Sequence, residues 1–118
     1  MRACLNSLIR QDEPPDEVIV IDNGSMDGSA EMVEQEYSPL PAPRFRLERN
    51  RENRGFAAAN NQGARLAAGR LIALLNNDAE AHPGWLKELR SGLARDPGYG
   101  MAACKILVWE DPSIIDKE

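Results

Sequence analysis

Histidine and cysteine are scarce in this chain of 118 residues, which contains one His and two Cys. His82 has no serine and acid near it at a spacing that would indicate a Ser-His-Asp triad. Cys4 and Cys104 lie far apart and match no zinc-ligand spacing, so we expect both to be reduced thiols of the core. The sequence therefore favours neither triad chemistry nor a Cys/His metal site.

The chain also lacks an excess of positive charge and any long apolar run. Its formal net charge of −5 argues against a nucleic-acid surface and against a polybasic membrane patch. Its apolar runs are too short to span a bilayer, and no secretion signal opens it, so we expect a cytoplasmic protein. Neither a dinucleotide-binding glycine pattern nor a P-loop pattern occurs.

Helix and strand patterns alternate along the sequence. Apolar residues at helical spacing predict helices over residues 2–11, from about 25 to 37, over 55–68 and from Pro83 onward. Short runs rich in residues that favour β-structure predict strands over residues 17–21, 45–49, 71–75 and 101–108. This alternation predicts a single α/β domain with a mostly parallel open sheet and helices on both faces.

Polar residues follow the first and third predicted strands at the points where these strands end. Asp22 and Asn23 follow the first, and Asn76, Asn77 and Asp78 follow the third. Ligands of open α/β sheets bind beyond the carboxyl ends of the strands, and oxygen-rich groups suit a hard divalent cation. The alternative is that the first group only forms a turn and that Asp78 only caps the next helix.

A third polar segment precedes the alanine-rich helix of residues 55–68. Asn53 and Arg54 lie directly before its start, where free backbone amides favour an anion. We expect these groups to face the same crevice, although a plain loop and helix start would also account for them.

Three segments together resemble glycosyltransferase family 2. Residues 18–29 (VIVIDNGSMDGS) resemble the family's VVDNGSTDGT segment, and residues 53–63 (NRGFAAANNQG) resemble its N-x-G-F-A-x-A-x-N-x-G segment. Residues 74–78 (LLNND) resemble its metal-binding D-x-D region. The resemblance covers nearly the whole chain. Asn76 stands where the D-x-D region has its first aspartate, and in this respect the sequence resembles the rhamnosyltransferase-like subgroup of the family.

The resemblance implies a GT-A fold that binds a nucleoside-diphosphate sugar. Asp22 would contact the base or ribose, Asn53 would lie near the nucleotide, and Asp78 would hold Mn²⁺ or Mg²⁺ on the diphosphate. The other expected donor-binding residues are Asn23, Arg54, Asn76 and Asn77.

The implied activity is inverting transfer of the sugar to a hydroxyl of a glycan or lipid-linked acceptor. This would take place in cell-surface polysaccharide synthesis, at the inner face of the membrane. Two alternatives are a non-catalytic nucleotide-sugar-binding module and a receiver- or flavodoxin-like α/β domain, in which Lys105 would match the late-strand lysine of receivers.

Two departures from the family pattern matter. Asn76 removes one acid from the expected metal site, and the match lacks the family's first strand and the region beyond Glu118. We therefore expect residues 1–118 to be a partial donor-binding domain that is inactive alone, with its catalytic base outside this chain. Unpaired sheet edges would favour self-association.

Overall fold

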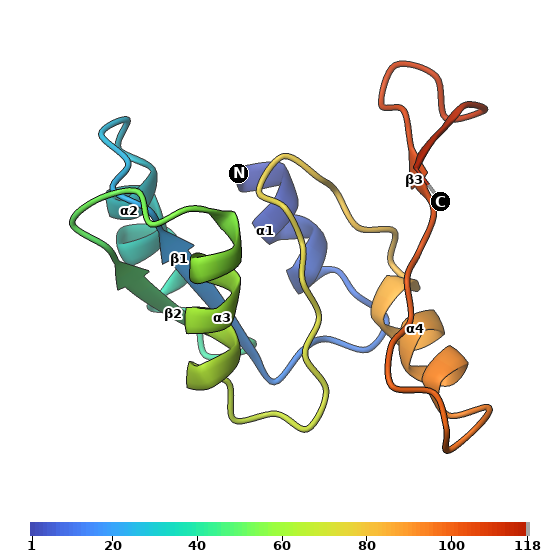
Figure 1. Ribbon diagram of the computed structural model, residues 1–118. Coiled ribbons are helices and arrows are strands. Elements are labelled where there is room, and N and C mark those ends of the chain that lie inside the picture. The colour runs from blue at the N-terminus through green and yellow to red at the C-terminus, as the bar shows by residue number, and fades with distance from the viewer. Residues whose placement is uncertain (118) are drawn as a thin grey trace.

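Helices and strands alternate over residues 1–117, which the computed structural model describes (Figure 1). The elements are α1 (Arg2–Ile9), β1 (Glu17–Asp22), α2 (Ser29–Met32), the π-helical turn η1 (Val33–Tyr37), β2 (Arg44–Arg49), α3 (Phe56–Leu66), α4 (Trp85–Leu93), β3 (Ile106–Leu107) and β4 (Ile115–Lys117). The predicted α/β class is confirmed, and the arrangement is consistent with the GT-A fold that the resemblance implies.

A parallel pair of strands forms the centre of the fold. Strands β1 and β2 pair in register from Glu17 opposite Arg44 to Asp22 opposite Arg49. The β-branched run of β1 favours an extended backbone, and the α2–η1 connection returns the chain to start β2 in the same direction. Both carboxyl ends therefore lie at one edge of the sheet, which is where a ligand of this fold class would bind.

One face of the strand pair packs against α1, α2 and η1. The core cluster on this face consists of Leu5, Leu8, Val18, Val33, Tyr37 and Phe45. The rings of Tyr37 and Phe45 lie 5.2 Å apart at 55°, and the Tyr37 hydroxyl donates to Asn6 Oδ1 at 3.0 Å. Removal of these apolar side chains from water is the main stabilising contribution on this face.

Helix α3 covers the other face of β1, as the predicted placement of helices on both faces requires. A Cβ built on Gly63 would lie 3.6 Å from Ile21 Cγ1, which is van der Waals contact, so this part of the helix lies close against the strand and leaves no room for a large side chain. Beyond the end of α3, the Ala68 amide donates to Glu17 Oε1 at 2.7 Å. Phe56 opens the helix and is 71% exposed, outside the stretch where Gly63 meets Ile21.

The prediction of a third strand over residues 71–75 is wrong. Within residues 1–117, β1 pairs with β2 only. Residues 71–75 pass on the side of β1 that faces away from β2 and join no sheet (Figure 1). Leu71, Ile72 and Leu74 are more than half exposed, whereas Leu75 packs against the core cluster. The run has the composition of a buried strand, but a strand also needs a backbone partner, and this segment makes no ladder.

The predicted strand over residues 101–108 is reduced to β3, which pairs antiparallel with β4 and not with a parallel neighbour. This hairpin projects from the body of the protein (Figure 1). Cys104, in the segment that leads into it, is exposed, so the expectation that this thiol lies in the core is wrong. Cys4 is buried, and both cysteines are free. Among the described residues, no helix has the length and apolarity that a membrane span requires.

Candidate functional site

Two of the predicted site residues, Asp22 and Asn23, lie where β1 ends and the following turn begins. Asp22 is 9% exposed, and its Oδ1 accepts a hydrogen bond from the Ser25 amide at 3.0 Å. The backbone carbonyl of Asp22 accepts from the Asn50 amide at 2.8 Å, which continues the strand pairing by one residue. Gly24 has φ +83°, a conformation that suits glycine. The Asp22 carboxylate therefore closes a turn at the edge where the strands end.

A network of side-chain amides links this turn to the end of β2 and to α3. Asn50 Nδ2 donates to Asn23 Oδ1 and to Gln62 Oε1, each at 2.9 Å. Asn23 Nδ2 in turn donates to the Gly55 carbonyl at 3.4 Å. These bonds hold the ends of β1 and β2 and the start of α3 in one polar edge.

Asn53 and Arg54 lie beside this edge, in the loop that leads into α3. Asn53 Oδ1 accepts from the Gly55 amide at 2.9 Å, so its side chain shapes the start of the helix. Arg54 is exposed and forms no salt bridge with the described residues. An unpaired guanidinium beside the amides of a helix start is a suitable partner for an anion.

Residues 76–79 form a second polar turn, here called the Asp78 turn. Asn76, Asn77 and Asp78 are exposed, and the Asn76 carbonyl accepts from the buried Cys4 thiol at 3.4 Å. Burial raises the pKa of that thiol, the positive N-terminus opposes the rise, and the nearby Asp78 carboxylate adds to it. Asp78 itself forms no ion pair within residues 1–117.

The predicted site residues thus form two groups. Asp22, Asn23 and Asn53 lie in one connected edge, whereas Asp78 belongs to the separate turn. Figure 1 shows the Asp78 turn (yellow) at the end of the structure toward which β1 runs. No hydrogen bond or ion pair joins the two groups within the part of the chain that the structure describes.

A divalent metal fits the Asp78 turn only if most of its ligands come from a substrate. Among residues 1–117, no three His, Cys, Asp or Glu side chains converge into a complete protein site. Mg²⁺ is usually held by one or two carboxylates together with substrate phosphates and water. The exposed, unpaired carboxylate of Asp78 matches that chemistry.

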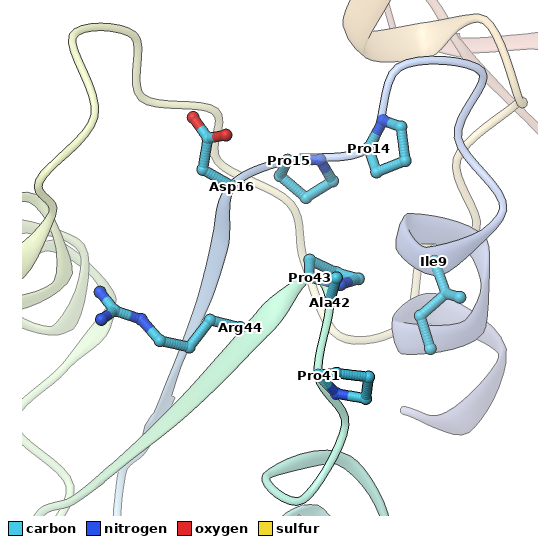
Figure 2. A pocket seen from close by; sticks show the side chains of 8 residues that line it. All are labelled: Ile9, Pro14, Pro15, Asp16, Pro41, Ala42, Pro43 and Arg44. Carbon is cyan, nitrogen blue, oxygen red and sulfur yellow. The ribbon is translucent and has the colours of Figure 1, made fainter.

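A pocket of about 280 Å³ lies elsewhere, at the amino ends of β1 and β2 (Figure 2). Its lining residues are Ile9, Pro14, Pro15, Asp16, Pro41, Ala42, Pro43 and Arg44. It lies at the end of the strands opposite to Asp22, so it is not part of the polar edge.

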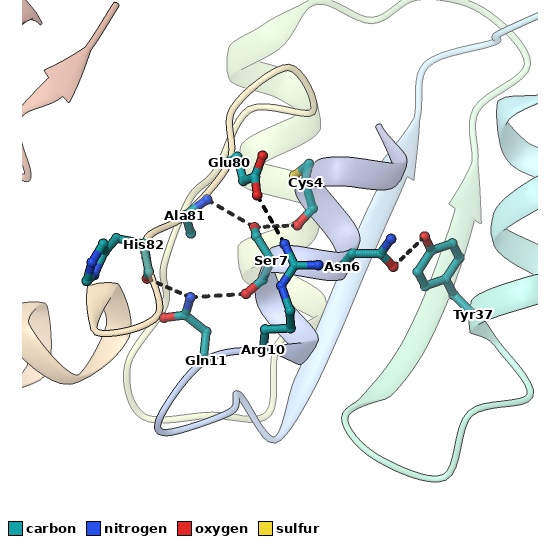
Figure 3. A network of polar contacts seen from close by, with 9 residues as sticks. All are labelled: Cys4, Asn6, Ser7, Arg10, Gln11, Tyr37, Glu80, Ala81 and His82. Atoms are coloured by element: carbon teal, nitrogen blue, oxygen red, sulfur yellow. Dashed lines mark hydrogen bonds and ion pairs between the residues drawn. The ribbon is translucent and has the colours of Figure 1, made fainter. Parts of the chain in front are cut away.

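Two sets of residues were missed by sequence reasoning. Asn50 follows β2 as Asn23 follows β1, and the parallel register, once known, makes them neighbours. Cys4, Ser7 and Gln11 recur at helical spacing beside the apolar positions of α1, and they contact the segment that contains Asp78 (Figure 3). The spacing in α1 could have been read from the sequence, but its partner segment could not.

One family model and several known proteins are similar in sequence to this chain. A model described as Glycosyl transferase family 2 matches residues 1–113. Glycosyltransferase AglE of Haloferax volcanii is 34% identical over 103 residues, which cover 86% of this chain and 32% of that protein. The uncharacterized glycosyltransferase YibD of Escherichia coli is 32% identical, over 87% of this chain and 29% of that protein.

The succinoglycan biosynthesis protein ExoO of Rhizobium meliloti is 34% identical over 85 residues, which cover 72% of this chain and 23% of that protein. The chain spans about a third or less of the length of these relatives. No solved structure is significantly similar to it. Because the family model matches nearly the whole sequence, this chain belongs to glycosyl transferase family 2.

Proposed function

We propose that residues 1–118 form the donor-binding part of a glycosyltransferase that takes a sugar from a nucleoside-diphosphate donor. The observation on which this depends most is the polar edge at the carboxyl end of β1, where the Asn50 amide holds Asn23 and Gln62 in place. A site whose amides are already fixed loses little conformational freedom when a nucleotide binds. Family membership supports the same ligand class and leaves the receiver- and flavodoxin-like alternatives without support.

In this proposal, the Asp22 carboxylate accepts hydrogen bonds from the base or ribose, and the Asn23 amide donates to it or accepts from it. Asn53 lies near the nucleotide, and Arg54 meets the diphosphate as an unpaired cation. Asn76 and Asn77 contact the donor from the Asp78 turn. The assignment to Arg54 is supported by its exposure and its position next to the start of α3.

Asp78, in the second group of predicted site residues, would bind the Mn²⁺ or Mg²⁺ ion. Such an ion supplies Lewis-acid neutralisation of the charge that develops on the diphosphate leaving group. Asp78 can hold it because its carboxylate is exposed and has no cationic partner among the described residues. Asn76, which replaces an acid in the resembled motif, supports the rhamnosyltransferase-like subgroup.

The proposed reaction is a single inverting displacement. The acceptor hydroxyl oxygen forms a bond to the anomeric carbon, the bond from that carbon to the diphosphate oxygen breaks, and the hydroxyl proton passes to a general base. We assign no residue of this chain as that base. The name of ExoO, a succinoglycan biosynthesis protein, supports a role in polysaccharide synthesis. The acceptor in this proposal is a glycan or a lipid-linked glycan, and the reaction takes place at the inner face of the membrane.

A calorimetric titration of the 118-residue chain with a panel of nucleoside-diphosphate sugars, with and without Mn²⁺, tests the donor site. We expect Mn²⁺-dependent binding that Asp78→Ala weakens by about tenfold or more, because interactions with a charged group contribute roughly 1.5–3 kcal/mol. Asp16→Ala is the matched control, since it removes an exposed acid at the opposite end of β1. Absence of binding by every donor, or an equal loss in both variants, would refute the proposal.

We also propose that a second copy of this chain covers the unpaired edge of β1. Within the described residues, neither that edge nor residues 71–75 join a further strand. The same run exposes Leu71 (59%), Ile72 (52%) and Leu74 (59%). Unpaired backbone groups beside exposed apolar side chains favour pairing with another chain.

A further inference from the structure

Helix α1 presents two different stripes of side chains. Leu5 and Leu8 point into the core cluster. Cys4, Ser7 and Gln11 follow one another at spacings of three and four residues, so they share a second side of the helix. Gln11 lies just beyond the end of α1 at Ile9. We call these three residues the α1 polar stripe. Ser7 is 1% exposed and Gln11 is 5% exposed, so their polar atoms need partners inside the protein.

Gln11 uses both ends of its amide to hold the chain around the start of α4. Its Nε2 donates to the Ser7 carbonyl at 3.1 Å and to the His82 carbonyl at 2.9 Å (Figure 3). Its Oε1 accepts from the Leu86 amide at 3.0 Å. The N-cap residue of α4, Gly84, offers no side-chain cap, so Gln11 satisfies one of the free amides of that helix from a distant part of the chain.

Ser7 makes the neighbouring contact. Its hydroxyl donates to the Cys4 carbonyl at 2.6 Å and accepts from the Ala81 amide at 3.0 Å. The next backbone bond follows directly, from the Asp12 amide to the Pro83 carbonyl at 2.9 Å. The segment of residues 79–86 is therefore bonded to the end of α1 at several successive points.

These bonds are the polar attachment of the segment that contains the Asp78 turn, beside the packing of Leu75 and Trp85 against the core cluster. Within residues 1–117, side-chain and backbone hydrogen bonds from residues 76–86 to other segments go to residues 4–12, apart from one between Trp85 Nε1 and Cys104 Sγ at 3.3 Å. The ion pair of Arg10 with Glu80 belongs to this set, but it lies at the surface and contributes little. Cys4, Ser7 and Gln11 are the buried members, and of these Ser7 and Gln11 make the bonds to residues 79–86.

We propose that Ser7 and Gln11 are positioning residues for Asp78. They hold residues 79–86 against α1 and thereby set where the Asp78 turn presents its carboxylate. This inference rests on the proposed role of Asp78 as a metal ligand, but the attachment itself can be measured without any ligand.

Hydrogen exchange measured by mass spectrometry on the 118-residue chain tests the attachment. Gln11→Leu keeps a similar volume but removes both donors and the acceptor, and Gln35→Leu is the matched control on the exposed side of η1. We expect the amides of residues 79–86 to exchange at least about tenfold faster in Gln11→Leu only, while β1 keeps its protection. Unchanged exchange in residues 79–86, or an equal acceleration in β1, would overturn the proposal.

A smaller substitution covers the case in which Gln11→Leu fails to fold. Ser7→Ala removes one hydroxyl and leaves the Ala81 amide without its acceptor. We expect faster exchange confined to residues 79–82. Wild-type exchange there would count against the proposal.

Mn²⁺ binding in the presence of UDP, followed by water-proton relaxation, tests the link to Asp78. We expect Gln11→Leu to weaken Mn²⁺ binding by about tenfold in the wild-type background and to have no further effect in the Asp78→Ala background. Equal effects in both backgrounds would mean that Gln11 does not act through Asp78. If the wild-type chain binds no Mn²⁺, the proposed function of Asp78 fails, and the positioning of Asp78 as a ligand fails with it. The exchange measurements then decide only whether Ser7 and Gln11 hold the segment.

Discussion

Asn50 donates a hydrogen bond from Nδ2 to Oδ1 of Asn23 over 2.9 Å, and this bond joins the residues that follow β2 and β1. The parallel register ends with Asp22 opposite Arg49, so the next residue of each strand is brought to the same place. The same Nδ2 also donates to Gln62 Oε1, which connects the pair to α3. The polar edge is thus a direct product of strand register.

We expect Asn50→Ala to destabilise the chain by about 1–2 kcal/mol and to weaken donor binding, because two partly buried amide oxygens lose their donor. Urea unfolding and calorimetric titration measure the two effects. Asn61→Ala, at an exposed position of α3, is the control, and it should be neutral or slightly stabilising since alanine favours helix. An Asn50→Ala protein as stable as the control would contradict this account of the edge.

Gly24→Ala should destabilise the chain more than Gly28→Ala does. The two glycines have nearly the same φ, +83° and +82°, so the strain of placing alanine there is similar, at about 1–2 kcal/mol. A Cβ on Gly24 would in addition lie 3.4 Å from the Glu52 Cα, whereas one on Gly28 meets no atom within 4 Å. Chemical denaturation gives the difference, and equal costs would show that the close approach of the two loops is unimportant.

The contribution of Glu17 to stability should depend on pH in the acid range. The Ala68 amide and then the Arg44 guanidinium lower the pKa of this carboxyl below its ordinary value of 4.5. A lowered folded-state pKa means that the stabilisation is fully present above about pH 4.5 and is lost as the pH falls through the folded-state value.

The difference in unfolding free energy between wild type and Glu17→Gln should therefore shrink as the pH falls below about 4.5. Denaturant titrations from pH 7 downward measure it. Glu88→Gln, at an exposed acid of α4, should follow the wild-type slope. A pH-independent difference for Glu17→Gln would rule out the ionised carboxylate as the source of the stabilisation.

Tyr37→Phe should cost about 1 kcal/mol, because it removes the hydroxyl that donates to Asn6 while leaving the ring against Phe45. Tyr99→Phe removes a hydroxyl from an exposed side chain and should have no measurable effect. Thermal unfolding of both variants makes the comparison. Equal unfolding temperatures would place the stabilising contribution of Tyr37 in its ring alone.

Self-association should appear as a concentration-dependent rise in sedimentation coefficient. Ile72→Lys places a charge in the exposed run of residues 71–75 and should lower the association, because charged side chains block edge pairing. Met26→Lys, at a fully exposed residue outside that run, should not. A cooperatively folding monomer at every concentration would disprove pairing through this edge.

Elements whose own pattern decides their structure were predicted well. The β-branched run of β1, the apolar spacing of α1 and the small residues of α3 each indicate one conformation, and the structure has them within a few residues of the expected bounds. The positions of Asp22 and Asn23 at the carboxyl end of β1 followed from the same reasoning, because the end of a strand lies at the sheet edge whatever its partners are, whereas their binding role stays a prediction.

Features that depend on a distant partner were not predictable in the same way. Residues 71–75 have the composition of a buried strand, but composition does not supply the neighbour with which a strand pairs. The side-chain bonds of Asn50, and those of Gln11 to His82 and Leu86, join residues 12 to 75 positions apart, so no local pattern contains them. Such contacts become visible only when register and packing are known.

A Cβ at position 63 would make an ordinary van der Waals contact with Ile21 Cγ1 at 3.6 Å, so the space between α3 and the sheet has room for a methyl group and little more. A bulky substitution would tilt or lift the helix. Its neighbour Gln62 would move with it and lose its alignment with Asn50. Relatives that differ in size at this position should therefore differ in how they orient the proposed nucleotide, although no atom of residue 63 need touch it.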